Sequence, residues 1–534
     1  MSEKYVVREL DRLDVLIAIL SGVGVLALYV RTMAPDILYG DSAELQTLAY
    51  TLGHTHSTGY PVYLLLARLV GFVPLNSQAW RITLFSALMG AVAIAGMYLL
   101  SRLLTNSRAG ACLTCIGLGL SYTLWSQAII TEVYAPGAAF LVWIFLLILH
   151  WYQNPEKRAL SLFVAALLAA LSLGVHATTA LAALPAAGFV FLWLIFQRGN
   201  PKEWRRALSA GIYGTILGVI LWLAAFLYID WHNPPSSFIN TMLYPSRSIW
   251  GLTPADMDTP LERISLTMNS VQWNDLLFKG GTDAARKSLL DYQHQMISRE
   301  FSVWFLLFGL YGLLILLFRS PWNAGYLLAS YGFVLFFALN YHPDDQYLFF
   351  LSTYIPIVAV SAVGIGALIE SPAKWIFLSS RGWAPIVSVC VTLILLGLTI
   401  QPALAQRLPS IRSGVARFVR EDYQFPVSNL KEPRLLGQVY LSALPDNALV
   451  LMEWRDLYVM AYLAYVEDKK PGIKLVEAMP RGNDGKLSAS MLETIRQALT
   501  DGRPVFAAQR FPGLAENFRL VTAKWYVQIF QKEK

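Results

Sequence analysis

The chain has 534 residues, of which 56% are apolar and only 14% are charged. Soluble globular proteins usually carry about 25% charged residues, so the composition excludes an ordinary soluble protein and indicates an integral membrane protein. The net charge of +7 is spread along the chain without a dense basic stripe. This distribution argues against a nucleic acid as the partner.

Apolar runs that are each long enough to cross a bilayer core recur through the first three quarters of the chain. Lys and Arg concentrate in the short loops on one side of these runs, which places the N-terminus in the cytoplasm by the positive-inside rule. An odd number of spans then puts the C-terminal region outside the cytoplasm. We expect eleven spans, at residues 13–30, 80–101, 110–127, 135–152, 159–175, 178–197, 208–229, 301–318, 324–340, 347–369 and 383–402.

The chain is expected to divide into two parts. Residues 1–402 form a transmembrane module with long outer loops at 31–79 and 230–300, and the charge-rich residues 403–534 form an extracytoplasmic domain. In this second part, strand-like runs at 448–452, 473–477 and 504–508 alternate with helical runs at 454–467 and 488–500, and a hairpin is expected within 517–530, which predicts a small α/β layer. It has no glycine-rich phosphate fingerprint, so an acceptor-binding or stabilising role is favoured over a nucleotide site.

Cysteine usage predicts no disulfide framework. The three cysteines, Cys112, Cys115 and Cys390, all lie inside apolar runs. Cys112 and Cys115 form a CxxC pattern, but no His or further Cys lies near them in sequence. Packing is therefore favoured over a metal or redox role.

The unusual polar residues all fall in loops on the outer face, whereas the span interiors carry almost no ionisable side chain. Transporters usually place acids or bases near the bilayer midplane, so this distribution favours an enzyme that acts at the membrane surface. The residues are Asp36, Asp41, Glu44, His54, His56, Glu132, His176, Asp230, His342, Asp344 and Asp345.

Residues 39–61 carry the sharpest local pattern. Asp41 and Glu44 open a helix with leucines on one face, which we expect to lie on the membrane surface, and the chain returns through His56 and a turn ending in Tyr60 and Pro61. An acid followed three residues later by Glu is also typical of a capping box, so a purely structural role stays open. Helix capping by Glu132, packing by His176 and an ordinary polar turn around Asp345 stay open in the same way.

Several motifs together resemble the protein-O-mannosyltransferase-like membrane family of the GT-C glycosyltransferase superfamily. They are Gly40-Asp41-Ser42 with Glu44, Gly53, His56, Gly59-Tyr60-Pro61, Glu132-Val133-Tyr134, Gly174 with His176, and Leu444 to Val450 at the start of the C-terminal domain. The resemblance implies a polytopic α-helical GT-C fold with about 11 transmembrane helices. It also implies transfer of a sugar from a polyprenyl-phosphate carrier to an acceptor hydroxyl on the extracytoplasmic side.

The resemblance implies Asp41 as the general base of an inverting displacement. Glu44, His56, Tyr60, Glu132, Tyr134, His176 and Asp345 are expected to bind substrate, and Arg247 and Arg299, chosen by charge and side, are expected to bind the leaving phosphate. No cofactor is expected beyond the lipid-linked sugar phosphate, and the acceptor is a protein, a glycan or a lipid. Metal-independent catalysis is favoured, although oxygen and nitrogen ligands among Asp41, Glu132, His176, His342 and Asp345 leave a divalent metal open.

Two other classes of function remain open from the sequence. One is a transporter or flippase of a lipid-linked substrate, and the other is a noncatalytic envelope assembly protein. For each class of function the protein is expected in the bacterial inner or plasma membrane. Replacing Asp41 separates these from an enzyme, because only an enzyme needs a base at this position.

Overall fold

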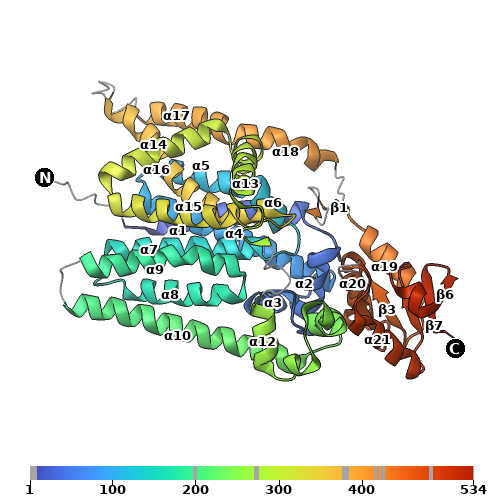
Figure 1. Cartoon of the computed structure of the whole chain (residues 1–534). Helices are drawn as coiled ribbons and strands as arrows, with labels where there is room; N and C mark the ends of the chain where they lie inside the picture. Colours follow the sequence, from blue (N-terminus) through green and yellow to red (C-terminus); the bar gives the residue numbers. More distant parts are fainter. Residues whose placement is uncertain are drawn as a thin grey trace.

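Long apolar helices form most of the computed structural model (Figure 1), which describes residues 9–196, 201–269, 276–375, 384–413, 418–419, 422–423, 427–479 and 485–532. In this described part of the chain, eight helices are long and apolar enough to cross a bilayer. A helix satisfies its own backbone hydrogen bonds, which lipid requires. The eight are α1 (Arg12–Thr32), α4 (Gln78–Leu104), α7 (Tyr134–Gln153), α9 (Ala177–Phe196), α10 (Pro201–His232), α15 (Pro321–Leu339), α16 (Leu351–Trp375, preceded by η7, Gln346–Phe350) and α17 (Ala384–Thr399).

Two bent helix pairs raise the number of possible spans to ten among the described residues. α5 (Arg108–Gly119) and α6 (Tyr122–Ala128) meet at 63°. α13 (Gly281–Gln295), with the π-helical turn η6 (Met296–Glu300), meets α14 (Val303–Arg319) at 112°. The chain is thus an integral multi-pass membrane protein.

All eleven expected spans fall on helices over their described residues, with residues 197 and 383 outside that part of the chain, but they are not all full spans. The expected span at 159–175 is α8 (Ala159–Leu171) with the short turn η1 (Ser172–Gly174), and it is shorter than the others. Those at 110–127 and 301–318 fall on the two bent pairs. Apolar content predicted where the helices lie, whereas the bends depend on packing that composition does not record.

Glycines allow the closest helix contacts in the bundle. A Cβ on Gly312 of α14 would lie 1.9 Å from the Val360 oxygen of α16, and one on Gly364 would lie 1.9 Å from the Phe308 oxygen. Without a hydrophobic driving force between helices in lipid, such close backbone packing is a main source of association. Gly214 of α10 packs in the same way against α8.

A buried charge cluster ties the start of α1 to α4 and α5. The Asp14 carboxylate is fully buried and accepts hydrogen bonds from Arg102 Nε at 2.9 Å, Arg108 Nε at 2.8 Å and Tyr98 at 3.2 Å. Asp14 also completes a capping box with Asp11 at the N-terminus of α1. Every charge in the cluster therefore has an opposite partner.

The helix that carries Asp41, α2 (Gly40–Thr51), is buried, although we expected it on the membrane surface. It packs against α4, against α3 (Pro61–Gly71) and against α20 (Trp454–Ala461) of the C-terminal region. Its leucine face suits either environment, so periodicity could not distinguish protein from lipid.

The loop between α10 and α13 packs partly on the C-terminal domain. Phe238, Met242 and Met257 form a small core with Met479 and Trp454. The loop is therefore attached to that domain along part of its length. Its described elements are η2 (Ile239–Leu243), α11 (Tyr244–Ser246), η3 (Arg247–Trp250), η4 (Pro254–Met257) and α12 (Pro260–Met268).

The C-terminal region forms the expected α/β layer. A five-stranded sheet has the order β4-β3-β5-β7-β6, with β3 parallel to β4 and β5, and with β7 antiparallel to β5 and β6. Its elements are α19 (Glu432–Ser442), β3 (Leu449–Met452), α20, η8 (Tyr462–Val466), β4 (Lys474–Glu477), α21 (Ala489–Thr500), β5 (Val505–Ala507), α22 (Leu514–Asn517), β6 (Phe518–Ala523) and β7 (Tyr526–Gln531). Before them come α18 (Gln401–Ser413), which lies beside α17 on the bundle, and a separate pair of short strands, β1 (Phe418–Val419) and β2 (Asp422–Tyr423).

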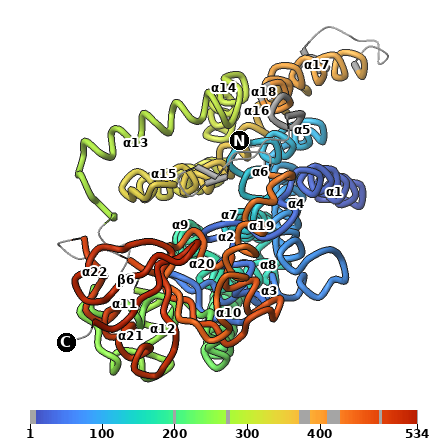
Figure 2. The backbone as a smooth tube through the Cα atoms, turned by 90° about the vertical axis from the view of Figure 1, so that its right-hand side faces the viewer, coloured from blue at the N-terminus to red at the C-terminus, as the bar shows by residue number. Residues whose placement is uncertain are grey.

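This domain is bonded to the first loop of the membrane module. Arg434 of α19 forms an ion pair with Asp36, and its Nη2 lies 2.8 Å from Asp36 Oδ1. Thr47 of α2 donates to the Tyr458 carbonyl at 3.2 Å, and the Tyr462 hydroxyl accepts from the Ala79 amide at 3.0 Å. Seen from its own end of the bundle (Figure 2), the domain lies over the side that carries α2, α8 and α10, while α13, α14 and α17 lie to one side of it.

Candidate active site

The site begins at the sharp entry into α2. Gly40 has a φ of +59°, a backbone conformation that side chains disfavour, and it turns the chain so that Asp41 lies in the first helical turn. Glu44 follows three residues later on the same face. The loop after α2 returns through a second such glycine, Gly59 at φ +85°, whose amide donates to the His56 carbonyl at 2.8 Å. The two turns bring His56 back to the carboxylates.

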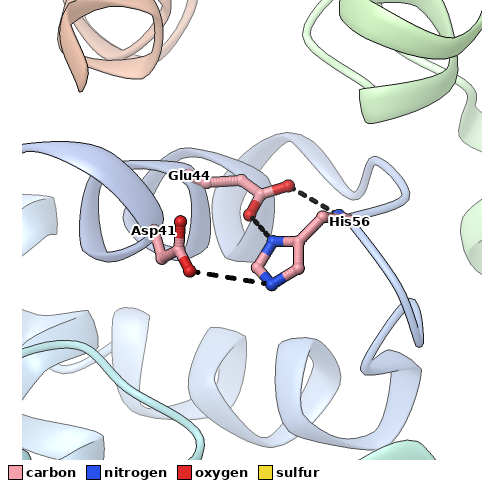
Figure 3. Close-up of side chains that lie close together, drawn as sticks. All are labelled: Asp41, Glu44 and His56. Carbon is pink, nitrogen blue, oxygen red and sulfur yellow. Dashed lines mark hydrogen bonds and ion pairs between the residues drawn. The ribbon is translucent and has the colours of Figure 1, made fainter. Parts of the chain in front are cut away.

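His56 lies between the two carboxylates of α2 (Figure 3). Its Nδ1 lies 2.5 Å from Glu44 Oε2, its backbone amide donates to Glu44 Oε1 at 2.8 Å, and its Nε2 lies 3.7 Å from Asp41 Oδ2. Glu44 is fully buried, whereas 48% of the Asp41 side chain is exposed. Glu44 therefore binds His56 rather than capping the helix, so the capping-box interpretation does not describe this pair.

The two histidines of the site differ in charge. Burial disfavours the charged form of His56, but the Glu44 and Asp41 carboxylates outweigh it and raise the pKa of His56 to about 10. Burial, with a smaller contribution from His56, lowers the pKa of His176 to about 3. At neutral pH His56 is cationic and His176 is neutral.

Asp41 faces a cavity of about 450 Å³ at the end of the bundle that carries the C-terminal domain. Five separate stretches of the chain contribute to it, as expected from the outer loops. The lining residues include Tyr39, Asp41, Ser42, His56, Thr58, Tyr60, Gln127, Ile130, Glu132, Tyr134, His176, Thr178, Leu276, Leu277, Tyr341, His342, Asp344, Asp345 and Phe349.

Within this cavity the structure brings together most of the residues singled out from the sequence. Ser42 donates to Glu132 at 3.4 Å, and Tyr134 donates to Asp345 at 3.1 Å. The His176 ring lies 5.0 Å from that of Tyr134 and 6.0 Å from that of Tyr60. The sequence therefore predicted that these residues lie close together, but it did not predict the distances between them.

Two other outer polar residues form a separate cluster beside the site. His54 Nε2 lies 2.9 Å from Asp230 Oδ1, and Arg263 of α12 donates to both Asp230 oxygens at 2.7 Å. The His54 carbonyl also accepts from the Phe238 amide at 2.8 Å. This cluster fixes the loop two residues before His56.

Arg247 and Arg299 are not among the described residues that line the cavity. Arg247 pairs with Glu493 of the C-terminal domain at 2.6 Å. Arg299 lies between the rings of Tyr122 and Tyr347, at 4.4 and 4.5 Å, and its Nε donates to Glu300 at 3.2 Å. The structure thus does not bring Arg247 and Arg299 to Asp41. They were chosen only by their charge and their side of the membrane, and these two properties do not determine where a side chain lies.

Trp454 is a site residue that the sequence did not reveal. Its indole N–H donates to Asp41 Oδ1 at 2.6 Å, and its ring meets that of His56 edge-on at 5.9 Å. A separation of 413 residues leaves no local signal for this contact. The C-terminal domain therefore contributes directly to the surroundings of Asp41.

Asp41, Glu44 and His56 have ligand atoms within 4.8 Å of one another, which fits a metal site better than the set expected from the sequence. Glu44 already holds His56 through Nδ1, so a metal would be bound by Asp41 Oδ2 and, after loss of its proton, by His56 Nε2, with Glu44 orienting the imidazole. A divalent cation held there would stabilise negative charge on a leaving phosphate. Metal-independent catalysis stays a prediction.

A multi-pass helical bundle with a polar cavity at its end, beneath a small α/β domain, is a GT-C-like membrane fold. The structure of ArnT from Cupriavidus metallidurans bound to undecaprenyl phosphate shares this fold, with a TM-score of 0.55 at 12% identity over 96% of this chain and 97% of that one. The arabinofuranosyltransferase AftD from Mycobacteria has a TM-score of 0.51 at 16% identity, over 96% of this chain and 38% of that one.

Residues 41–200 match the family model described as the Protein O-mannosyl-transferase TMEM260 N-terminal domain. Over 230 residues, the chain is 28% identical to Protein O-mannosyl-transferase TMEM260 of Mus musculus (42% of this chain, 31% of that protein). It is 26% identical to its counterpart from Dictyostelium discoideum, also over 230 residues (40% and 28%). The matched part thus spans less than a third of these curated relatives. Residues 41–200 are therefore similar to protein O-mannosyltransferases in sequence, which confirms the resemblance in the motifs.

Proposed function

We propose that the protein is a membrane glycosyltransferase that moves a sugar from a polyprenyl-phosphate carrier to an acceptor hydroxyl on the extracytoplasmic side. The names of the two curated relatives, both protein O-mannosyl-transferases, support mannose as the sugar and a protein hydroxyl as the acceptor. The undecaprenyl phosphate bound to ArnT, which shares the fold, supports the carrier class.

The observation that carries the proposal is the Asp41 carboxylate, half exposed to a polar cavity and held by Trp454 at one oxygen. Asp41 takes the proton from the acceptor hydroxyl as that oxygen bonds to the anomeric carbon. The bond from the anomeric carbon to the phosphate oxygen breaks, and its electron pair leaves with the phosphate. A single displacement of this kind inverts the anomeric configuration.

His56 supplies the positive charge for the leaving phosphate, in place of Arg247 and Arg299. Glu44 keeps His56 cationic and fixes its ring through a contact of 2.5 Å. Charge placed before the reaction stabilises the phosphate as it leaves, without rearrangement. The neutral His176 acts as a hydrogen-bond partner of the sugar or phosphate.

The Asp41→Asn variant tests the proposal. Without the base, transfer of labelled mannose from polyprenyl-phosphate mannose to a Ser- or Thr-containing peptide is expected to fall about 1000-fold, equivalent to about 4 kcal/mol of barrier. The melting temperature of the purified protein is expected to stay within a few degrees of wild type, because Asp41 is half exposed.

Asp283→Asn on α13 is the matched control, because it removes an exposed acid that does not line the cavity. It is expected to transfer like wild type. Near-wild-type transfer by a folded Asp41→Asn protein would refute the base assignment. If the wild-type protein transfers no sugar but moves the lipid-linked donor from one leaflet of a vesicle membrane to the other, the protein is a transporter instead.

A further inference from the structure

Gln127 of α6 has an amide side chain whose polar atoms are unmatched. The residue lines the Asp41 cavity and is only 1% exposed. Neither its amide nitrogen nor its amide oxygen has a hydrogen-bond partner among the described residues. Buried polar groups are almost always hydrogen-bonded, because an unmatched one destabilises the fold. An unmatched amide on a cavity wall therefore indicates a ligand that supplies the partner.

The charged groups of the same cavity differ from Gln127 in this respect. Asp41 accepts from Trp454, and Asp345 accepts from Tyr134. Two other atoms of the wall resemble those of Gln127, since Thr58 Oγ1 and His342 Nε2 are buried without a hydrogen-bond partner in the described part of the chain. The amide of Gln127 and the hydroxyl of Thr58 thus offer uncharged hydrogen-bonding groups without a partner among the described residues.

The chemistry of these groups selects the ligand. An amide presents one accepting oxygen and two donating N–H bonds, and a hydroxyl both donates and accepts, so the two can satisfy one another. A carboxylate or phosphate only accepts, so it would leave the amide oxygen of Gln127 without a donor. The wall that contains Gln127 fits a neutral group with several hydroxyls.

We propose that Gln127 is a specificity-determining residue that binds a hydroxyl of the transferred sugar, with Thr58 and His342 on the same cavity wall. This assignment rests on the proposed function and adds which residues bind a hydroxyl of the sugar. A site built to bond a hydroxyl discriminates strongly against an analogue that lacks it.

The Gln127→Met variant separates binding from structure. Methionine has a similar length without the amide, so the melting temperature of the substrate-free protein is expected to equal or exceed that of wild type. Transfer is expected to weaken, with kcat/KM for polyprenyl-phosphate mannose about 10-fold lower or more. A residue needed for structure would give a melting temperature several degrees below wild type, which would overturn the assignment.

Donors that lack one hydroxyl identify the contact. With polyprenyl-phosphate carrying 2-, 3-, 4- or 6-deoxymannose, wild type is expected to show a lower kcat/KM for at least one analogue than for mannose. Gln127→Met is expected to lose this difference for that analogue and to keep any difference for the others. An equal loss for every donor would overturn the proposal. Gln438→Met, on the exposed face of α19, is the matched control and is expected to behave like wild type.

The outcomes distinguish this proposal from the one on which it rests. If wild type transfers sugar and Gln127→Met matches Gln438→Met with every donor, only the assignment of Gln127 fails. If wild type transfers no sugar from any donor, the proposed function fails, and the role of Gln127 fails with it.

Discussion

Two buried charge clusters lie at opposite ends of α1 and are built differently. At the start of α1, Asp14 is enclosed by Arg102, Arg108 and Tyr98. Beyond its other end, His56 lies between buried Glu44 and half-exposed Asp41, which faces a cavity. The first cluster has no charge left for a ligand, whereas the second presents one to the cavity. The comparison shows that the two clusters differ in enclosure: the acid of the candidate active site is open to a cavity, whereas Asp14 is not.

The largest effect on stability is expected from Asp14→Asn. Removing one partner from a buried ion pair leaves an uncompensated charge, here on Arg102, and costs about 3–5 kcal/mol of unfolding free energy. Activity per folded molecule should stay at the wild-type level, because the site lies at the other end of the helix. Thermal unfolding in detergent and transfer by the folded fraction measure the two effects. A stable but inactive variant would show that the clusters do not have separate roles.

A smaller effect, on catalysis, is expected from Glu44→Gln. The carboxylate offsets the burial that disfavours charged His56, so its loss lowers the pKa of His56 from about 10. Transfer at pH 7.5 is expected to fall about 10- to 100-fold, and the alkaline limb of kcat/KM to move by at least about one pH unit. The dependence of kcat/KM on pH, recorded for wild type and Glu44→Gln, measures both the fall in activity and the shift of the alkaline limb. Glu493→Gln on α21 is the control, and an unmoved limb would exclude the His56 cation from the reaction.

The same pair gives the folded protein a pH-dependent stability. The pKa of His56 is raised from 6.5 to about 10, so protonated His56 stabilises the fold fully below pH 6.5. This stabilisation is lost as the pH rises through about 10. Melting temperatures of wild type and Glu44→Gln across this range should converge at the alkaline end, and parallel curves would contradict the expectation.

The smallest effect is expected from Trp454→Phe, which keeps an aromatic ring but loses the N–H bonded to Asp41. Loss of one hydrogen bond to a carboxylate is expected to lower kcat about 10-fold with little change in the melting temperature. Trp525→Phe, at an exposed tryptophan of the same domain, is the control. Equal activities of the two variants would mean that the indole N–H does not position Asp41.

Patterns of short range predicted much of this molecule. Apolar runs located the spans, and strand-like runs between helical ones located β3, β4 and β5 to within a residue or two. The family motifs also named Asp41, Glu132 and His176, which lie in one cavity. These features are predictable because each depends on residues that are close in sequence or on motifs that the family shares.

Contacts between distant residues could not be predicted. Trp454 reaches Asp41 from another domain, and the unmatched amide of Gln127 becomes visible only when its neighbours are placed. Arg247 carried the right charge on the expected side, yet Glu493, which pairs with it, lies 246 residues away. The sequence gives the type of each of these side chains, but it does not give the distant residue that each one contacts.

The attachment of the C-terminal domain to α2 sets the order in which the enzyme can become active. Asp41 leaves the ribosome early, but Trp454, which bonds to it, and Arg434, which holds Asp36, are made about 400 residues later. Until then the membrane helices can insert while the reaction centre is still incomplete. The surroundings of Asp41 are therefore complete only after the C-terminal domain has been synthesised and has folded against α2.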